Sequence, residues 1–126
     1  MGITSTSPAL NMIVIYSKDV QRLVKFYQTY FGFTPVGEAA GDLVELQAGA
    51  NGASLLIHKA GKAVRLGQAS VKLVFSVNDV NAFKAAASEL GLDFGSTHHA
   101  NGYDYANAKD PDGNSISISS RLYRLD

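Results

Sequence analysis

The chain has 126 residues, of which 46% are hydrophobic and 17% charged, and this composition indicates one compact globular domain rather than a disordered chain. Eleven Lys and Arg residues balance eleven Asp and Glu residues, so neither a nucleic acid nor a membrane surface is an expected partner. The chain contains no cysteine, which excludes disulfides, thiolate metal sites and cysteine nucleophiles.

The first residues of the chain carry no targeting pattern, and we therefore expect a cytoplasmic protein. Residues 1–8 are small and polar, whereas a signal peptide has basic residues followed by an apolar segment. No apolar stretch of the sequence is long enough to cross a bilayer.

The first half of the chain predicts a strand, a helix and three more strands. Residues 12–16 are β-branched and apolar, which favours a strand. Residues 20–31 place apolar side chains at helical spacing, with Asp19 as the N-cap and Gly32 as the glycine that ends the helix. Asn51-Gly52 is a strong hairpin signal between the last two strands. The three further strands are expected over residues 33–38, 43–48 and 53–59.

The second half repeats this order. A strand is expected over residues 71–77, then a helix over 80–90 that Asp79 caps and Gly91 ends, then strands over 94–99, 103–109 and 115–120. Asp19 and Asp79 are 60 residues apart, and the Asn51-Gly52 and Asp112-Gly113 turns are 61 apart. A nearly constant offset indicates an internal repeat. We therefore expect two βαβββ modules, at about 11–59 and 71–120, within a single domain of residues 1–126.

Alternation of apolar and polar residues gives each predicted sheet two different faces. In residues 115–119, Ile116 and Ile118 should enter a core, whereas Ser117 should lie on the other side. The helix of each module should cover the apolar side. We therefore expect an α+β fold whose curved sheet surrounds a cleft, with the helices outside, and a generic α+β sandwich is the alternative.

The sequence resembles the vicinal oxygen chelate superfamily, which includes glyoxalase I, extradiol dioxygenases and bleomycin resistance proteins. The resemblance rests on the S-x-D-V of residues 17–20, the F-Y of 26–27, the x-F-G-F of 30–33 and the D-P-D-G-N turn of 110–114. It implies two βαβββ modules that form an open U-shaped mixed sheet, and a homodimer in the small members. It does not determine the function, because one scaffold can host many chemistries.

Enzymes of this superfamily hold a divalent metal with His, Glu or Gln at matched positions of the two modules. The resemblance places these positions at Met12, Lys72, Ser117 and Leu56, or at Ile57 or Leu55 if the register slips. None of these side chains is the carboxylate or imidazole that such an ion prefers. We therefore expect no metal and no other cofactor.

The predicted cleft is lined by apolar and aromatic side chains and one cation. Lys72 lies in the middle of a strand, where its ammonium could hold a carboxylate or phosphate of a ligand; an ion pair with Glu45 is the alternative. Tyrosines offer aromatic walls with a polar tip, and core packing is their alternative role. The predicted ligand-binding residues are Met12, Tyr16, Leu56, His58, Lys72, Tyr103, Tyr105 and Ser117.

The adjacent residues His98 and His99 should point to opposite sides of their strand, so both cannot easily chelate one ion. The role of this pair stays open, and no catalytic residue is predicted. No Gly-rich phosphate loop and no Ser/His/Asp motif occurs in the sequence.

The sequence therefore predicts a metal-independent, homodimeric protein of the glyoxalase and bleomycin resistance type that binds a hydrophobic or aromatic ligand with an acidic group. The rival hypothesis is a lyase, an isomerase or a dioxygenase-like enzyme. Such an enzyme would take a metal from unexpected ligands such as His58 and His99, or use Lys72 or His58 in acid–base work without a metal. A third hypothesis is a domain with a filled cleft that only mediates assembly. Whether the modules pair within a chain or across a dimer stays open.

Overall fold

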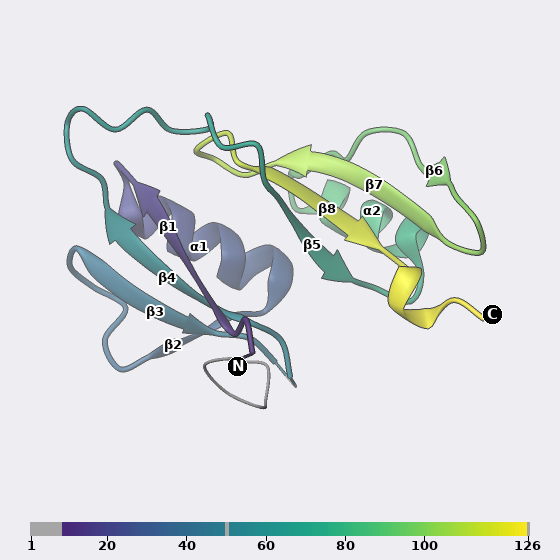
Figure 1. Ribbon diagram of the computed structural model, residues 1–126, viewed down its shortest axis with the longest axis horizontal. Coiled ribbons are helices and arrows are strands. Elements are labelled where there is room, and N and C mark those ends of the chain that lie inside the picture. Colours follow the sequence, from purple (N-terminus) through teal and green to yellow (C-terminus); the bar gives the residue numbers. More distant parts are fainter. Residues whose placement is uncertain (1–8, 50, 126) are drawn as a thin grey trace, which may run out of the picture. The chain divides into compact units, whose positions relative to one another are not determined.

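The structure of the protein is a computed structural model that describes residues 9–49 and 51–125. The chain divides into two compact units, Met1–Val64 and Arg65–Asp126. Each unit is an α+β module with one α-helix and one four-stranded sheet (Figure 1). That the units together act as a single domain stays a prediction.

The first unit is a βαβββ module with an open mixed sheet. The strand order is β1-β4-β3-β2, in which β1 and β4 are parallel and the other neighbours are antiparallel. The helix α1 contacts β1, β3 and β4, so it covers one face of the sheet. The elements are β1 (Met12–Ser17), α1 (Val20–Phe31), β2 (Thr34–Val36), β3 (Leu43–Gln47) and β4 (Ser54–Lys59).

The second unit has the same topology, with the strand order β5-β8-β7-β6. Its first and last strands, β5 and β8, are again parallel neighbours, and the other pairs are antiparallel. This identity of order and direction confirms the predicted repeat of βαβββ modules. The elements are β5 (Lys72–Ser76), α2 (Val80–Glu89), β6 (His98–His99), β7 (Asp104–Lys109), β8 (Ser115–Ser119) and the short 3-10 helix η1 (Arg121–Tyr123).

Both helices begin at the predicted aspartates. Asp19 Oδ1 accepts a hydrogen bond from the Arg22 N–H at 3.1 Å, and Asp79 Oδ1 accepts one from the Ala82 N–H at 3.0 Å. Each cap stabilises its helix by about 1 kcal/mol. Gly32 ends α1 in the left-handed conformation, with φ 67°, as predicted. In the described part of the chain, none of the helices has the length and hydropathy of a membrane span.

Each sheet buries the face that its helix covers. In the first unit the inward side chains of β3 and β4 are almost fully buried, together with Tyr27 of α1. In the second unit Ile116 and Ile118 are fully buried, as the alternation with serine predicted. Three strand serines are buried as well, Ser17, Ser117 and Ser119. The buried apolar strand residues are Ile15, Val44, Leu46, Leu55, Ile57, Ala106, Ile116 and Ile118.

Two of the predicted strands are much shorter than expected, whereas the others differ from their predicted bounds by one residue at one or both ends. The strand predicted over residues 33–38 is only Thr34–Val36, and the one predicted over 94–99 is only His98–His99. The reason in the second case is packing against α2. The Phe94 ring lies 6.2 Å from the Phe83 ring, and Thr97 is hydrogen-bonded to two α2 side chains instead of continuing a strand ladder.

The turn between β7 and β8 is held by the carboxylate of Asp110. Its Oδ1 accepts from the Asp112 and Asn114 N–H groups, each at 2.9 Å, and its Oδ2 accepts from Asn114 Nδ2 at 2.8 Å. Gly113 supplies the expected positive φ, 85°. Gly67, in the loop before β5, packs on this turn: a Cβ there would lie 3.1 Å from the Asp112 carbonyl oxygen.

This contact predicts that Gly67→Ala lowers the free energy of unfolding by roughly 1–2 kcal/mol, because alanine would have to keep φ at 71° and its methyl would press on backbone oxygens. Gly61→Ala is the matched control, since the backbone at Gly61 is outside the left-handed region and a methyl group there would meet nothing within 4 Å. Denaturant unfolding of both variants measures the difference. Equal stabilities would show that residue 67 does not pack on the turn.

Candidate functional site

In each unit, the sheet face that points away from the helix carries predicted ligand-binding residues, seven of the eight in all; Tyr103 directly precedes β7. We call the face of the first unit the apolar face and that of the second unit the cationic face. The apolar face holds Met12, Val14, Tyr16, Thr34, Val36, Leu43, Glu45, Gln47, Ser54, Leu56 and His58. The cationic face holds Lys72, Val74, Ser76, Tyr105, Asn107, Lys109, Ser115, Ser117 and Ser119.

The apolar face exposes hydrophobic side chains in neighbouring positions of its strands. Met12, Val14 and Tyr16 are 40%, 44% and 50% exposed, although they alternate with inward residues that pack under α1. The strand register sets Val14 beside Leu56 and Tyr16 beside His58. A face of this composition can gain free energy by covering an apolar molecule, at about 25 cal/mol per Å² of apolar surface removed from water.

One end of the apolar face is aromatic. The rings of Tyr16 and His58 have centroids 5.4 Å apart and are tilted by 54°. His58 Nδ1 lies 2.7 Å from the Lys59 carbonyl oxygen, so Nε2 is the ring nitrogen that does not contact this carbonyl. The pair therefore combines an apolar ring surface with polar tips, which suits an aromatic ligand with few polar groups.

The cationic face is crossed by a lysine side chain. Lys72 Nζ on β5 donates a hydrogen bond to Asn107 Oδ1 on β7 at 3.0 Å. Because β8 lies between these two strands, the Lys72 side chain must reach across it. Ser117, which sits on β8 in register with both Val74 and Asn107, is only 2% exposed, and its hydroxyl donates to the Ala106 carbonyl at 3.0 Å.

Aromatic rings border the lysine. Lys72 Nζ lies 5.9 Å from the centroid of the Tyr105 ring, within cation–π range. The His98 ring stacks on Tyr105 with a centroid distance of 5.0 Å, and the Tyr103 ring lies 6.3 Å from Tyr105. Arg121 contacts the Tyr103 ring, with Cζ 5.2 Å from its centroid. This face therefore offers aromatic surface beside several positive charges.

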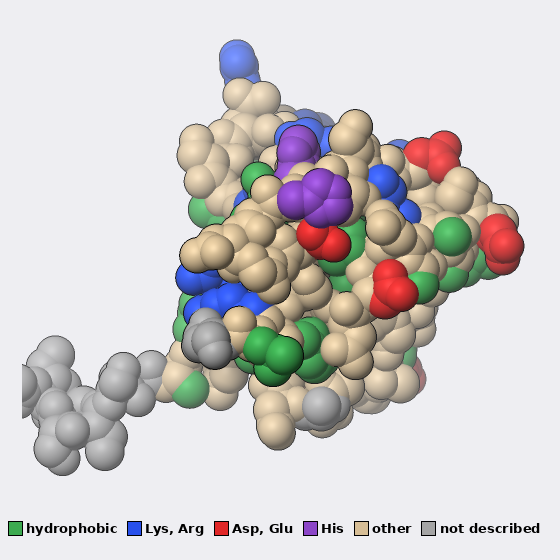
Figure 2. Space-filling model, turned by 90° about the vertical axis from the view of Figure 1, so that its right-hand side faces the viewer, with side chains coloured by type: hydrophobic (Ala, Val, Ile, Leu, Met, Phe, Trp, Pro, Cys, Tyr) green, Lys and Arg blue, Asp and Glu red, His purple; other side chains and the backbone are tan. Residues whose placement is uncertain are grey.

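The two adjacent histidines point to opposite sides, as predicted. His98 stacks on Tyr105 of the cationic face, whereas His99 Nδ1 lies 2.6 Å from Asp104 Oδ1 on the other side of the strand. Figure 2 shows histidine side chains at the surface beside an acidic side chain, and the His99 side chain is 76% exposed. This exposed pair contrasts with a buried catalytic dyad, which would be shielded from water.

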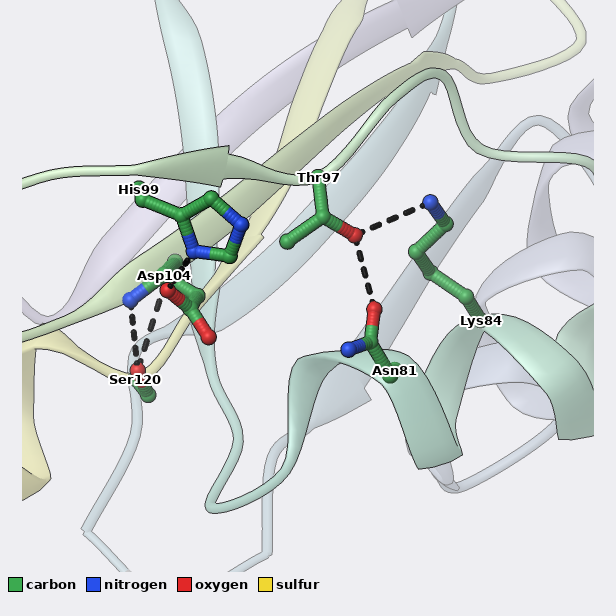
Figure 3. Close-up of polar contacts among 6 residues, drawn as sticks. All are labelled: Asn81, Lys84, Thr97, His99, Asp104 and Ser120. Atoms are coloured by element: carbon green, nitrogen blue, oxygen red, sulfur yellow. Dashed lines mark hydrogen bonds and ion pairs between the residues drawn. The ribbon is translucent and has the colours of Figure 1, made fainter.

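Ser120 lies near the same pair without forming a catalytic triad (Figure 3). Its Oγ accepts from the Asp104 N–H at 2.9 Å and donates to the Asp104 carbonyl at 3.4 Å, so it bonds the backbone rather than the imidazole. A serine nucleophile needs a hydrogen bond to its histidine base. The arrangement therefore fixes the end of β7 and supplies no activated nucleophile.

The side chains at the four positions where the resemblance implies metal ligands do not fit a divalent ion. They offer a thioether, an alkyl group, an ammonium and a hydroxyl, at Met12, Leu56, Lys72 and Ser117. The ammonium and the hydroxyl donate their hydrogen bonds to an amide and a backbone carbonyl. In residues 9–49 and 51–125, no group of three His, Cys, Asp or Glu side chains is placed to hold one ion.

Asn107 and Lys109 also lie on the cationic face, although neither is among the predicted ligand-binding residues. Both could have been found by counting outward from the turn at residues 110–114, because an antiparallel hairpin then pairs Lys109 with Ser115 and Asn107 with Ser117. The stacking of His98 on Tyr105 could not be found in this way, since β6 is two residues long and its register depends on packing against α2.

Comparisons with known proteins agree with this fold. A family model described as Glyoxalase/Bleomycin resistance protein/Dioxygenase superfamily matches residues 9–118. No curated protein matches the sequence.

Several solved structures share the fold. A lactoylglutathione lyase from Agrobacterium tumefaciens is 21% identical with a TM-score of 0.73, over 96% of this chain and 100% of that one. TnmS3, an antibiotic binding protein from Streptomyces sp. CB03234, is 22% identical with a TM-score of 0.73, over 91% and 96%. A glyoxalase/bleomycin resistance protein from the same Streptomyces is 23% identical with a TM-score of 0.68, over 87% and 98%. At these identities the likeness shows the fold alone.

The exposed contact of Lys72 predicts that Lys72→Met changes the free energy of unfolding by less than about 0.5 kcal/mol, because exposed polar pairs contribute little to stability. Thermal and denaturant unfolding measure the change. The alternative ion pair with Glu45 predicts a larger loss, which Glu45→Gln would reproduce. Losses in the two variants that fail to add in the double variant would establish that pair.

Proposed function

The chain belongs to the glyoxalase/bleomycin resistance protein/dioxygenase superfamily, and we propose that it binds a hydrophobic or aromatic small molecule with an acidic group, without using a metal. The proposed binding residues lie on the apolar face and on the cationic face. A homodimeric, cytoplasmic protein is part of the proposal, because the resemblance implies a dimer in the small members.

One observation carries the proposal. At the positions where metal-dependent relatives would need carboxylates or imidazoles, this chain has Met12, Leu56, Lys72 and Ser117. Two of these extend an apolar surface, and a third brings its own positive charge, which would repel a metal ion. The residues that replace the ligands are thus suited to holding an organic molecule directly.

The apolar face supports the binding of a ring system. Its exposed side chains include Val14, Tyr16 and Leu43, which is 53% exposed. Binding sites for small molecules are mostly apolar and aromatic, with a few polar groups that orient the ligand. Here Tyr16, His58 and Glu45 would supply the orienting groups on this face.

The solved structures with this fold include both a binding protein and an enzyme, which are the two main hypotheses for this chain. One is named as an antibiotic binding protein and another as a lactoylglutathione lyase. The enzyme hypothesis would need His58 or His99 as a metal ligand or base. Both contacts, that of His99 with Asp104 and that of His58 with the Lys59 carbonyl, use Nδ1, so Nε2 of each ring would have to act. A metal would need further ligands beside such a nitrogen, and in residues 9–49 and 51–125 no three His, Cys, Asp or Glu side chains are grouped to hold one ion.

The first test of this proposal is metal content. Protein produced in medium supplemented with zinc, nickel, manganese and iron should carry no stoichiometric divalent ion after desalting, because its side chains at the ligand positions bind such ions poorly. Elemental analysis by mass spectrometry measures the content, and the melting temperature with and without EDTA is the control. One tightly held ion per chain, with melting lowered by EDTA, would support the enzyme hypothesis instead.

The second test is a thermal-shift panel with planar polycyclic probes such as 2-naphthol and 9,10-anthraquinone. A probe that binds only the folded state adds about 2.7 kcal/mol of stability at 100 times its Kd, which raises the melting temperature. The matched control is decahydro-2-naphthol, which keeps the size of 2-naphthol but cannot stack on rings and should shift melting less. No shift with any polycyclic probe would favour a domain that only mediates assembly.

A further inference from the structure

We propose that the cationic face recognises a planar aromatic carboxylic acid, with Lys72 and Asn107 binding the carboxylate and Tyr105 packing against the ring. This inference rests on the proposed function and deepens it by naming the ligand class and the residues that select it. All the contacts that support this inference lie within the second unit.

The Lys72 ammonium is positioned by its neighbours while remaining accessible. It donates one hydrogen bond to Asn107 Oδ1 at 3.0 Å and lies 5.9 Å from the Tyr105 ring centroid. An ammonium has three donors, so this contact leaves capacity for further acceptors. Holding a long side chain across β8 before a ligand arrives also reduces the conformational entropy that binding must overcome.

Asn107 adds a second donor beside the ammonium. An ammonium has no acceptor, so the side-chain oxygen of Asn107 must be the atom that faces it. The Asn107 NH₂ group is then directed away from Lys72 and presents donors of its own. Two donor groups on neighbouring side chains match the two oxygens of a carboxylate, which is an acceptor only when ionised.

The charge on this face favours an anion. The nine strand positions of the cationic face include two lysines and no carboxylate. The second lysine, Lys109, donates to Ser115 Oγ at 2.8 Å. Asp104, the acidic residue of β7, points to the other side, where it pairs with His99. An anion on the cationic face is therefore attracted by two lysines, and none of these strand positions carries a carboxylate that would repel it.

The ring of the ligand has an aromatic partner next to the carboxylate site. His98 and Lys72 approach Tyr105 from opposite sides of β7, because β6 and β8 are its two neighbours in the sheet. Tyr103 extends the aromatic surface at 6.3 Å. A flat ring joined directly to a carboxylate can thus contact the part of the Tyr105 and Tyr103 surface that the stacked His98 leaves uncovered, while its acid group reaches Lys72.

Two probes of the same shape test this inference: 2-naphthoate, which is an anion at pH 7, and 2-naphthamide, which is neutral. Titration calorimetry at low and moderate salt measures both affinities. We expect 2-naphthoate to bind about tenfold more tightly, the effect of one hydrogen bond between charged groups. The difference should shrink as salt increases, since both groups are partly exposed.

Three variants assign the preference to residues. Lys72→Met removes the charge with little change in length and should weaken 2-naphthoate about tenfold while leaving 2-naphthamide within about twofold. Asn107→Asp keeps the shape but places a carboxylate beside Lys72, and should also abolish the preference. Lys84→Met is the matched control: Lys84 Nζ donates to a neutral oxygen, Thr97 Oγ1, at 3.0 Å, but it extends from α2 (Figure 3). It should leave the preference unchanged.

The outcomes separate this inference from the proposed function. Equal binding of the two probes by the unaltered protein, or a preference that survives Lys72→Met, would overturn the inference and leave the proposed function standing. A preference that Lys84→Met also abolishes would mean that general charge, not this site, selects the acid. Failure of both probes and of the polycyclic panel to bind would overturn the proposed function together with the inference.

Discussion

The register of the second sheet depends on the carboxylate of Asp110. Its three hydrogen bonds within the turn fix residues 110–114, and Lys109 is consequently paired with Ser115. Because side chains alternate along a strand, a slip by one residue would move Asn107 from the cationic face into the core and bring Ala108 out. The contact between Lys72 and Asn107 therefore depends on a turn to which neither residue belongs.

Most of the fold could be predicted from the sequence because its signals are local. Helix caps at Asp19 and Asp79, the glycine after α1 and the burial of the two β8 isoleucines each follow from signals within a few residues, and they appear as expected. Ser117 and Ser119, on the other side of β8, are buried too. The prediction for residues 94–97 was wrong because the conformation of this segment depends on contacts with α2. Such contacts between distant segments leave no periodic pattern in the sequence.

The candidate site was predictable only in part. Because side chains alternate along a strand, the sequence correctly predicts that Met12 and Tyr16 share one side of β1, and Leu56 and His58 one side of β4, away from the helix. The partner of Lys72 was not predictable in the same way, because it lies two strands away across β8. The alternative partner, Glu45, was chosen for its charge, whereas the contact in the structure is to a neutral amide.

The shared topology of the two units affects how the side chains of their two exposed sheet faces can change during evolution. The equivalent strands β4 and β8 present Ser54, Leu56 and His58 in one unit and three serines in the other. No strand of the described residues belongs to both sheets, so a substitution on one face leaves the hydrogen-bond register of the other intact. A duplicated module of this kind lets the exposed side chains of one copy be replaced without disturbing the strand pairing of the other, so the two faces can diverge separately.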